Sequence, residues 1–322
     1  MRTQRSKSNG WTESMASILD AIGNTPLVKL RFCETSVPIY GKCEHLNPGG
    51  SVKDRLALAL VDDGERTGKL KPGGTIVEAT AGNTGLGLAL VAAARGYKLV
   101  CILPEKMSVD KRKALRAVGA HVIVTDNAPL DSEKNFRNLA RSLAAERGWF
   151  LADQFCNQAN VEAHFSTTGP EILEALNGNI GAFIAGVGTG GTISGCGRFL
   201  KAADPNIQIV LADPVGSSLA DWINKGEYGP DESYAVEGIG SSRSTDIMDR
   251  SVVDEAISIT DEESFETALR LQREEGLLVG GSSGTAVAAA VRLARSGRVK
   301  KPIVALLADS WDRYFSQPWM NI

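Results

Sequence analysis

Short apolar runs alternate with helical stretches along this 322-residue chain, and this alternation is the strongest constraint on its fold. The pattern predicts strands over residues 75–79, 97–103, 121–125, 181–185, 207–212 and 303–307. Helical stretches over 86–95, 110–118 and 192–201 stand between them. Strands and helices at this spacing favour parallel sheets with helices on both faces, so we expect an α/β protein with two doubly wound parallel sheets.

The strands form two series, separated by the polar stretch 126–147, and this division predicts two α/β domains. A hydrophobic content of 43% is enough for cores of that size. The basic and polar start predicts a disordered N-terminal arm, and no apolar run follows it as a secretory signal would require.

The formal net charge of −3 and a pI near 5.8 give no electrostatic reason to expect a nucleic acid or an anionic membrane as partner. No apolar run is long enough to span a bilayer. The five cysteines are dispersed and predict reduced thiols in a cytoplasmic protein. None of the three histidines has metal-ligand spacing, so we expect structural roles for them and no metal.

Ligands of such folds bind at the carboxyl ends of strands, where three glycine-rich loops follow predicted strands or apolar runs. In the loop 186–192, backbone amides can converge on one phosphate, and Thr189 and Thr192 add hydroxyl groups. The same loop satisfies G-x-G-x-x-G, with Asp213 about twenty residues further on. A dinucleotide site and a tight structural turn therefore stay open as alternatives.

The loops 80–85 and 280–284 carry directed polar groups. Small residues leave the amides of the first loop open to a carboxylate, and Thr80, Asn83 and Thr84 supply side-chain partners. Ser282 can hydrogen-bond a buried heterocyclic nitrogen. For both loops the alternative is an ordinary helix cap.

Lys53 follows a Pro-Gly-Gly turn and opens a helical stretch over residues 54–61. The positive potential of a helix N-terminus disfavours the ammonium form, so this amine can attack an aldehyde more easily. A solvated surface lysine is the alternative. Together, a reactive lysine, a phosphate loop and a polar anchor are what a pyridoxal phosphate enzyme needs.

In their order and spacing, five motifs resemble the fold-type II pyridoxal phosphate family of cysteine synthase and cystathionine β-synthase. They lie at residues 23–27, 47–55, 80–85, 186–192 and 280–284. Further runs, such as 104–108, 212–217 and 249–254, are most similar to the catalytic core of the cystathionine β-synthase branch.

The resemblance implies a tryptophan synthase β-like fold with pyridoxal phosphate between two domains. A smaller, mobile domain would span residues 45–150, and a larger one residues 17–44 and 151–322. Residues 1–16 would be the disordered arm. The protein would be a cytoplasmic homodimer that acts on small amino acids.

The family pattern also implies roles for single residues. Lys53 would be the catalytic lysine that holds the cofactor, Asn83 would bond its 3′-oxygen, and Ser282 would face its pyridine nitrogen. Its phosphate would be held by Gly188, Thr189, Gly190, Gly191 and Thr192. The carboxylate of the amino-acid substrate would be taken by Thr80, Gly82, Thr84 and Gln154.

Two positions depart from the family pattern. Ala81 stands where a serine is usual, and Ser241-Ser242-Arg243 replaces the Tyr-Asp-Phe run of the cystathionine branch. The second departure resembles members that make diaminopropionate precursors from O-phosphoserine. Arg243 is therefore a candidate for an anionic substrate group, with an exposed loop arginine as the alternative.

The resemblance predicts β-replacement on serine, or on an O-activated serine, by a thiol. A cysteine synthase that uses O-acetylserine or O-phosphoserine with sulfide is the nearest alternative. A nicotinamide-dependent dehydrogenase built on residues 186–191 and a non-catalytic binding protein are more distant ones.

Overall fold

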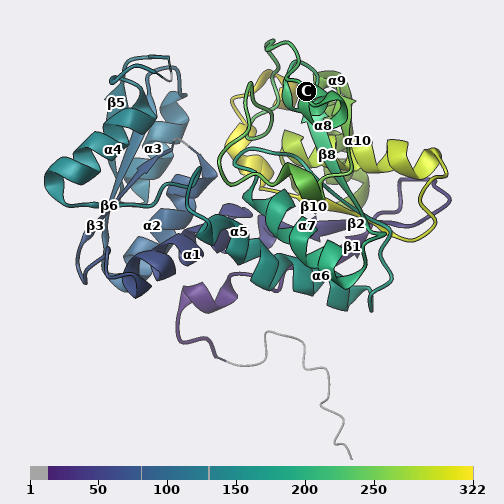
Figure 1. Ribbon diagram of the computed structural model, residues 1–322, viewed down its shortest axis with the longest axis horizontal. Coiled ribbons are helices and arrows are strands. Elements are labelled where there is room, and N and C mark those ends of the chain that lie inside the picture. The colour runs from purple at the N-terminus through teal and green to yellow at the C-terminus, as the bar shows by residue number, and fades with distance from the viewer. Residues whose placement is uncertain (1–13, 81, 130, 322) are drawn as a thin grey trace, which may run out of the picture.

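The computed structural model describes residues 14–80, 82–129 and 131–321. Two sheets organise the chain, one with the strand order β5-β4-β3-β6 and one with the order β1-β2-β10-β7-β8-β9. Figure 1 shows the two sheets side by side, with helices α1 and α5 between them. Most of the arm predicted over residues 1–16 lies outside the described residues.

All strand pairs of the four-stranded sheet are parallel. Its strands are β3 (Thr75–Ala79), β4 (Lys98–Pro104), β5 (His121–Thr125) and β6 (Phe150–Leu151). Helices cover both faces because the central strands are apolar on both sides. One face packs against α1 (Lys53–Arg66), α2 (Asn83–Arg95) and α3 (Val109–Ala117), and the other against α4 (Phe136–Arg147).

The six-stranded sheet is also parallel except at one edge, where β1 runs antiparallel to β2. Its strands are β1 (Leu27–Lys29), β2 (Ile39–Cys43), β7 (Ala182–Ala185), β8 (Gln208–Pro214), β9 (Glu255–Ile259) and β10 (Ile303–Leu307). Helices α9 (Asp261–Glu275) and α10 (Gly281–Arg295) cover one face. The other face packs against α6 (Gly169–Ala175), α7 (Gly191–Ala203) and α8 (Leu219–Lys225).

The predicted α/β class with helices on both faces of parallel sheets is confirmed. Two details differ from the sequence pattern: β1 runs antiparallel to β2, and the polar stretch 126–147 contains a helix of the four-stranded sheet. Its second half is α4, whose Ala140 and Ala144 are buried against the four-stranded sheet. A helix that buries only a narrow row of small side chains has a mostly polar sequence, so its sequence pattern does not indicate a packed helix.

Short helical elements complete the chain: α5 (Ala159–Ala163), a π-helix (His164–Thr168), and 3-10 helices at Ile18–Ala21, Glu44–Leu46, Arg250–Val252, Trp311–Tyr314 and Pro318–Met320. Within the described ranges no helix is long and apolar enough to cross a membrane. The same ranges contain no group of three or more His, Cys, Asp or Glu side chains that could hold a metal. All five cysteines are free thiols.

Candidate active site

Lys53 is the first residue of α1 and lies beside the extension of β10. The amide of Val52 donates to the carbonyl of Ala308 at 2.8 Å, and Ser51 pairs with Asp309 in an isolated bridge. Burial lowers the pKa of the Lys53 amine, while Asp309 and Glu44 oppose this effect. The predicted direction of the pKa shift is therefore found, but burial rather than the helix N-terminus is its main cause.

Arg313 holds the turn before Lys53, and sequence reasoning gave it no role. Its guanidinium donates to the carbonyl oxygens of Gly49 and Gly50, the latter at 2.7 Å. Gly50 has φ +78°, a conformation that favours glycine, so the Pro-Gly-Gly turn fits this position. The C-terminal segment thus fixes the entry into α1 from outside the motif.

Asn83 and Ser282 are not helix caps, although the sequence left that alternative open. The N-cap residues of α2 and α10 are Gly82 and Gly280, which have no side chain to cap a helix. The Asn83 side chain instead donates to Asp309 Oδ2 at 2.7 Å. Ser282 is buried in the first turn of α10, next to Ser283, whose hydroxyl accepts from the Ala308 amide.

The loop 186–190 ends β7 and leads into α7, with Gly190 as the N-cap. Among the described residues, the amides of Gly188, Thr189, Gly190 and Thr192 donate no hydrogen bond. Free amides at the N-terminus of a 13-residue helix form a site for an anion.

The two threonine hydroxyls of this loop are held by buried side chains. Thr189 Oγ1 accepts from Asn160 Nδ2 at 3.0 Å, which leaves its own hydrogen free to donate. Thr192 Oγ1 lies 3.2 Å from His164 Nε2, and His164 Nδ1 lies 2.9 Å from Thr168 Oγ1. Burial lowers the pKa of His164 to about 3, so this histidine is neutral at pH 7.

The glycines of this loop are also required by close packing. A Cβ on Gly191 would lie 2.0 Å from Asn160 Oδ1, and one on Gly188 would lie 2.5 Å from the carbonyl of Gly238. Gly190 has φ +86° and would place a Cβ 2.7 Å from Met248 Cβ. The two alternatives therefore do not exclude each other, because the glycines that leave the amides free are also required for a tight structural turn.

Asp213 does not support the dinucleotide alternative. Its side chain is fully buried, and its Oδ2 accepts from the amide of Ala220 at 2.8 Å. Burial raises the pKa of Asp213 to about 6. A carboxylate in this position is not available to bond a ribose hydroxyl, as the dinucleotide fingerprint requires.

The candidate carboxylate loop follows β3 and opens α2. Among the described residues the amides of Asn83 and Thr84 donate to no group, whereas the Gly82 amide donates to Thr80 Oγ1 at 3.3 Å. Ala81, where the family has serine, lies outside the described residues. The N-terminus of α2 is therefore a second place where an anion would be stabilised.

Gln154 comes close to this loop but uses its polar atoms within the protein. Its Oε1 accepts from the Thr84 hydroxyl at 2.7 Å, and its Nε2 donates to Glu78 Oε1 at 3.1 Å. Burial raises the pKa of Glu78 to about 7. In this arrangement Gln154 orients Thr84 rather than offering a free donor.

Arg243 lies on an exposed loop, with its guanidinium 4.6 Å from the ring centre of Tyr228. Within the ranges that the structure describes, it makes no hydrogen bond or ion pair to Lys53 or to the loop 186–190. It is three residues beyond Gly240, whose amide donates to the carbonyl of Val187 at 2.8 Å. The loop that carries Arg243 is thereby attached to the candidate phosphate loop.

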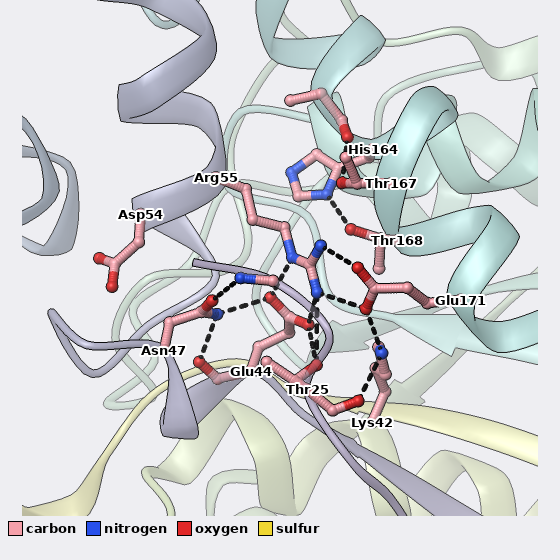
Figure 2. Close-up of polar contacts among 12 residues, drawn as sticks. Thr25, Lys42, Glu44, Asn47, Asp54, Arg55, His164, Thr167, Thr168 and Glu171 are labelled. Atoms are coloured by element: carbon pink, nitrogen blue, oxygen red, sulfur yellow. Dashed lines mark hydrogen bonds and ion pairs between the residues drawn. The ribbon is translucent and has the colours of Figure 1, made fainter. Parts of the chain in front are cut away.

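A buried ion cluster surrounds Arg55 (Figure 2). Arg55, two residues further along α1, donates to Glu44 Oε2 at 2.7 Å and to Glu171 Oε1 at 2.7 Å. Lys42 also reaches Glu171, at 2.5 Å. Burial alone would raise the pKa of Glu44, but Arg55 and, to a lesser extent, Lys42 overcome it and lower that pKa to about 2.

Sequence reasoning missed the residues that connect the site. They are Arg55, Asn160, Asp309, Arg313 and Tyr314. Asn160 donates both to the carbonyl of Gln154 and to Thr189, so it connects the candidate phosphate loop to the residue that holds Thr84. Only Asp309 had a usable signal, because it follows the predicted strand 303–307 at its carboxyl end.

Comparison with known proteins agrees with this geometry. The family model described as pyridoxal-phosphate dependent enzyme matches residues 18–309. The chain is 45% identical to the cystathionine beta-synthase of Apis mellifera, over 99% of this chain and 65% of that protein. It is 43% identical to the cysteine synthase of Staphylococcus aureus strain Mu50, over 94% of this chain and 96% of that protein. The chain therefore spans less than two thirds of the first relative and nearly all of the second.

Two solved structures are similar along nearly the whole chain. The crystal structure of O-ureido-L-serine synthase has a TM-score of 0.88 at 38% identity and covers 96% of each chain. A hydrogen sulfide-producing enzyme from Fusobacterium nucleatum has a TM-score of 0.86 at 35% identity, over 95% of this chain and 99% of that one.

Proposed function

The chain belongs to the family of pyridoxal-phosphate dependent enzymes, and from this premise we propose that it replaces the β-substituent of an amino acid. The substrate would be serine or an O-activated serine, and the incoming group a thiol, as in cystathionine β-synthase. The observation that carries this proposal is the set of free amides at the N-terminus of α7, in one chain with a half-buried lysine of lowered pKa at the start of α1.

The described residues fit the cofactor. The phosphate would bind the amides of Gly188, Thr189, Gly190, Gly191 and Thr192, with the threonine hydroxyls as further donors. Lys53 would hold the aldehyde carbon, Asn83 the 3′-oxygen, and Ser282 would face the pyridine nitrogen. Bound pyridoxal phosphate supplies an electron sink for negative charge at the Cα of an amino acid.

The protein's own groups would bind and deprotonate the amino acid. The Lys53 amine would take the proton from Cα, and its lowered pKa favours the neutral form that can accept a proton. The amides at the N-terminus of α2, together with Thr80, Gly82 and Thr84, would bind the carboxylate. We assign Gln154 to this group because it holds the Thr84 hydroxyl.

A cysteine synthase reaction with sulfide is the second candidate. It is favoured by the similarity to the cysteine synthase of Staphylococcus aureus, to which the chain is 43% identical over 96% of that protein. The two reactions share the lysine, the phosphate loop and the carboxylate loop, and differ in leaving group and nucleophile.

A substrate panel separates the two candidates. Serine, O-acetylserine and O-phosphoserine are each paired with homocysteine and with sulfide, and the thioether or cysteine product is quantified. Cystathionine from serine or an activated serine supports the first candidate, and cysteine alone supports the second. No product from any pair, in protein that retains pyridoxal phosphate, would exclude both.

We propose further that the protein works as a homodimer in the cytoplasm, with residues 45–150 moving as a unit. Five free thiols support a reducing compartment. Exposed apolar side chains on neighbouring segments, Leu278 and Phe315, support association. Sedimentation equilibrium tests the dimer, and a monomer at micromolar concentration would contradict it.

Thr192→Val is expected to weaken pyridoxal phosphate binding about tenfold, because a hydroxyl donor to a charged phosphate is lost from a site of unchanged volume. Fluorescence titration of the apoprotein measures this affinity, and Thr67→Val, at the distant end of α1, is the control. This change is a cleaner test than Gly190→Asp, which would strain a residue at φ +86° against Met248. Equal affinity in Thr192→Val and the parent would argue against the assigned loop.

Arg243→Ala is expected to lower kcat/KM for O-phosphoserine about tenfold and to affect O-acetylserine less, since a guanidinium stabilises an anionic leaving group. The matched control is Arg147→Ala. Arg147 is the last residue of α4, and it is another exposed arginine that lies over an aromatic ring, that of Trp149. If both donors change equally, Arg243 is a surface charge that stacks on Tyr228.

A further inference from the structure

Asp309 is a buried carboxylate at the carboxyl end of β10, and only 2% of the residue is exposed. Its Oδ2 accepts two hydrogen bonds, from Asn83 Nδ2 at 2.7 Å and from the Tyr314 hydroxyl at 2.6 Å. Its Oδ1 is buried and has no partner among the described residues. Asp309 is thus the direct neighbour of a residue that we assign to the cofactor.

The surroundings prevent this carboxylate from turning away. A Cβ on Gly280 would lie 2.5 Å from Asp309 Oδ1 and 2.4 Å from Tyr314 Cε2, so the glycine allows a very close approach. The Gly280 amide donates to the Asp309 carbonyl at 3.1 Å. The next residue, Ser310, donates to the Gly50 carbonyl at 3.1 Å. Backbone and side chain of Asp309 are therefore both fixed.

The identity of the acceptor decides how the Asn83 amide is turned. A carboxylate accepts hydrogen bonds and does not donate them, so Asn83 must present its NH₂ group to Asp309. If Asp309 takes up a proton, the unpartnered Oδ1 is the free place for it, and Oδ2 still accepts from Asn83. An NH₂ group has two hydrogens, and Asp309 takes one of them.

We propose that Asp309 is a positioning residue which, by accepting one N–H of Asn83, presents the second N–H as the donor to the 3′-oxygen of the cofactor. This inference rests on the proposed function, because it assumes that Asn83 faces the cofactor. It gives Asp309, a residue of the C-terminal segment that lies outside all three glycine-rich loops, a role in cofactor binding.

Burial raises the pKa of Asp309, while Tyr314, Arg313, Asn83 and Lys53 oppose the shift. The groups around the carboxyl are thus donors and cations from three elements: the start of α1, the start of α2, and the 3-10 helix Trp311–Tyr314. These donors and cations favour a hydrogen-bond acceptor at this position, in agreement with the bond that Asp309 accepts from Asn83.

The test compares the affinity of apoprotein for pyridoxal 5′-phosphate and the visible spectrum of the loaded protein. Asp309→Ala and Asn83→Ala are each expected to weaken binding about tenfold and to shift the absorption maximum. The double variant is expected to be no weaker than either single one, because both changes remove the same positioned donor. Asp309→Asn is expected to stay within about twofold of the parent, because its amide oxygen can accept both bonds.

Tyr314→Phe is the matched control, since it removes the other donor to Oδ2 and leaves the bond to Asn83. It is expected to lower the melting temperature of the apoprotein without shifting the absorption maximum. If Asp309→Ala does not fold, Asp309→Ser takes its place, because a serine hydroxyl is too short to reach Asn83.

A purely structural role for Asp309 predicts a different set of results. Asp309→Ala would then lower the melting temperature but retain the parent's affinity and spectrum, or its effect would add to that of Asn83→Ala. Either result overturns the inference while the parent still binds the cofactor. A parent protein that binds no pyridoxal phosphate would overturn the proposed function, and the inference with it.

Discussion

Lys53→Ala is expected to remove the visible absorption band of protein-bound pyridoxal phosphate and to lower kcat by more than about 10³-fold. The reason is that one amine both holds the cofactor and takes the Cα proton, so its loss removes two functions at once. Absorption spectra and single-turnover rates of the two proteins, after incubation with the cofactor, measure the effect.

The control for this change is Lys69→Ala, which removes an exposed lysine beyond the end of α1. It should leave both readouts unchanged. A Lys53→Ala protein that keeps the parent's band and rate would place the reactive amine elsewhere. A colourless parent that gains thermal stability with a nicotinamide dinucleotide would instead favour the dehydrogenase alternative.

Arg55→Met is expected to have the largest effect on stability, a loss of about 3–5 kcal/mol in the free energy of unfolding. The guanidinium is 3% exposed and neutralises Glu44, which is fully buried, as well as Glu171. Without Arg55, Glu44 becomes a buried charge whose remaining partners are uncharged, apart from the nearby Lys42. Urea unfolding followed by circular dichroism measures the loss.

The matched control is Arg66→Met, at the other end of the same helix. The Arg66 side chain is 75% exposed and pairs with Asp63, and a surface pair of this kind contributes about 0–1 kcal/mol. Equal losses in the two variants would mean that the buried cluster stabilises the protein no more than a surface pair does.

The difference between parent and Arg55→Met should depend on pH. The pKa of Glu44 is lowered to about 2 in the folded protein, against about 4.3 when unfolded, so its contribution is present above pH 4.3. It is lost as the pH falls toward 2. The two unfolding curves should therefore be furthest apart near neutral pH and approach each other below pH 4, and a constant separation would contradict this origin.

Much of the fold could be predicted because strands buried on both faces are short apolar runs. The expected strands 75–79, 121–125 and 303–307 agree with β3, β5 and β10 to the residue. β1 was missed because three residues on a sheet edge leave no periodicity to recognise. The resemblance to the fold-type II family is confirmed, whereas the roles of single site residues stay predictions.

The supporting residues could not be predicted for a different reason. Asn83 and Asp309 are separated by 226 positions, and Arg55 and Glu171 by 116. Local patterns report helix starts, caps and loops, but they do not report which distant polar group a buried side chain will meet. The glycine-rich motifs indicate where ligands would bind, but which buried side chains support those motifs depends on tertiary packing.

The double hydrogen bond of Asn160 connects Thr189 of the candidate phosphate loop to the backbone of Gln154, whose side chain accepts a hydrogen bond from Thr84 in the candidate carboxylate loop. One NH₂ group is shared between the carbonyl of Gln154 and the Thr189 hydroxyl, so a ligand that fixes either partner reduces the freedom of the other. Linkage is reciprocal, so an anion on the first loop changes the binding free energy at the second by the same amount as an anion on the second changes it at the first. If the two helix N-termini bind their anions as proposed, we expect their occupancies to form one coupled equilibrium, in which the affinity measured at either loop depends on the state of the other.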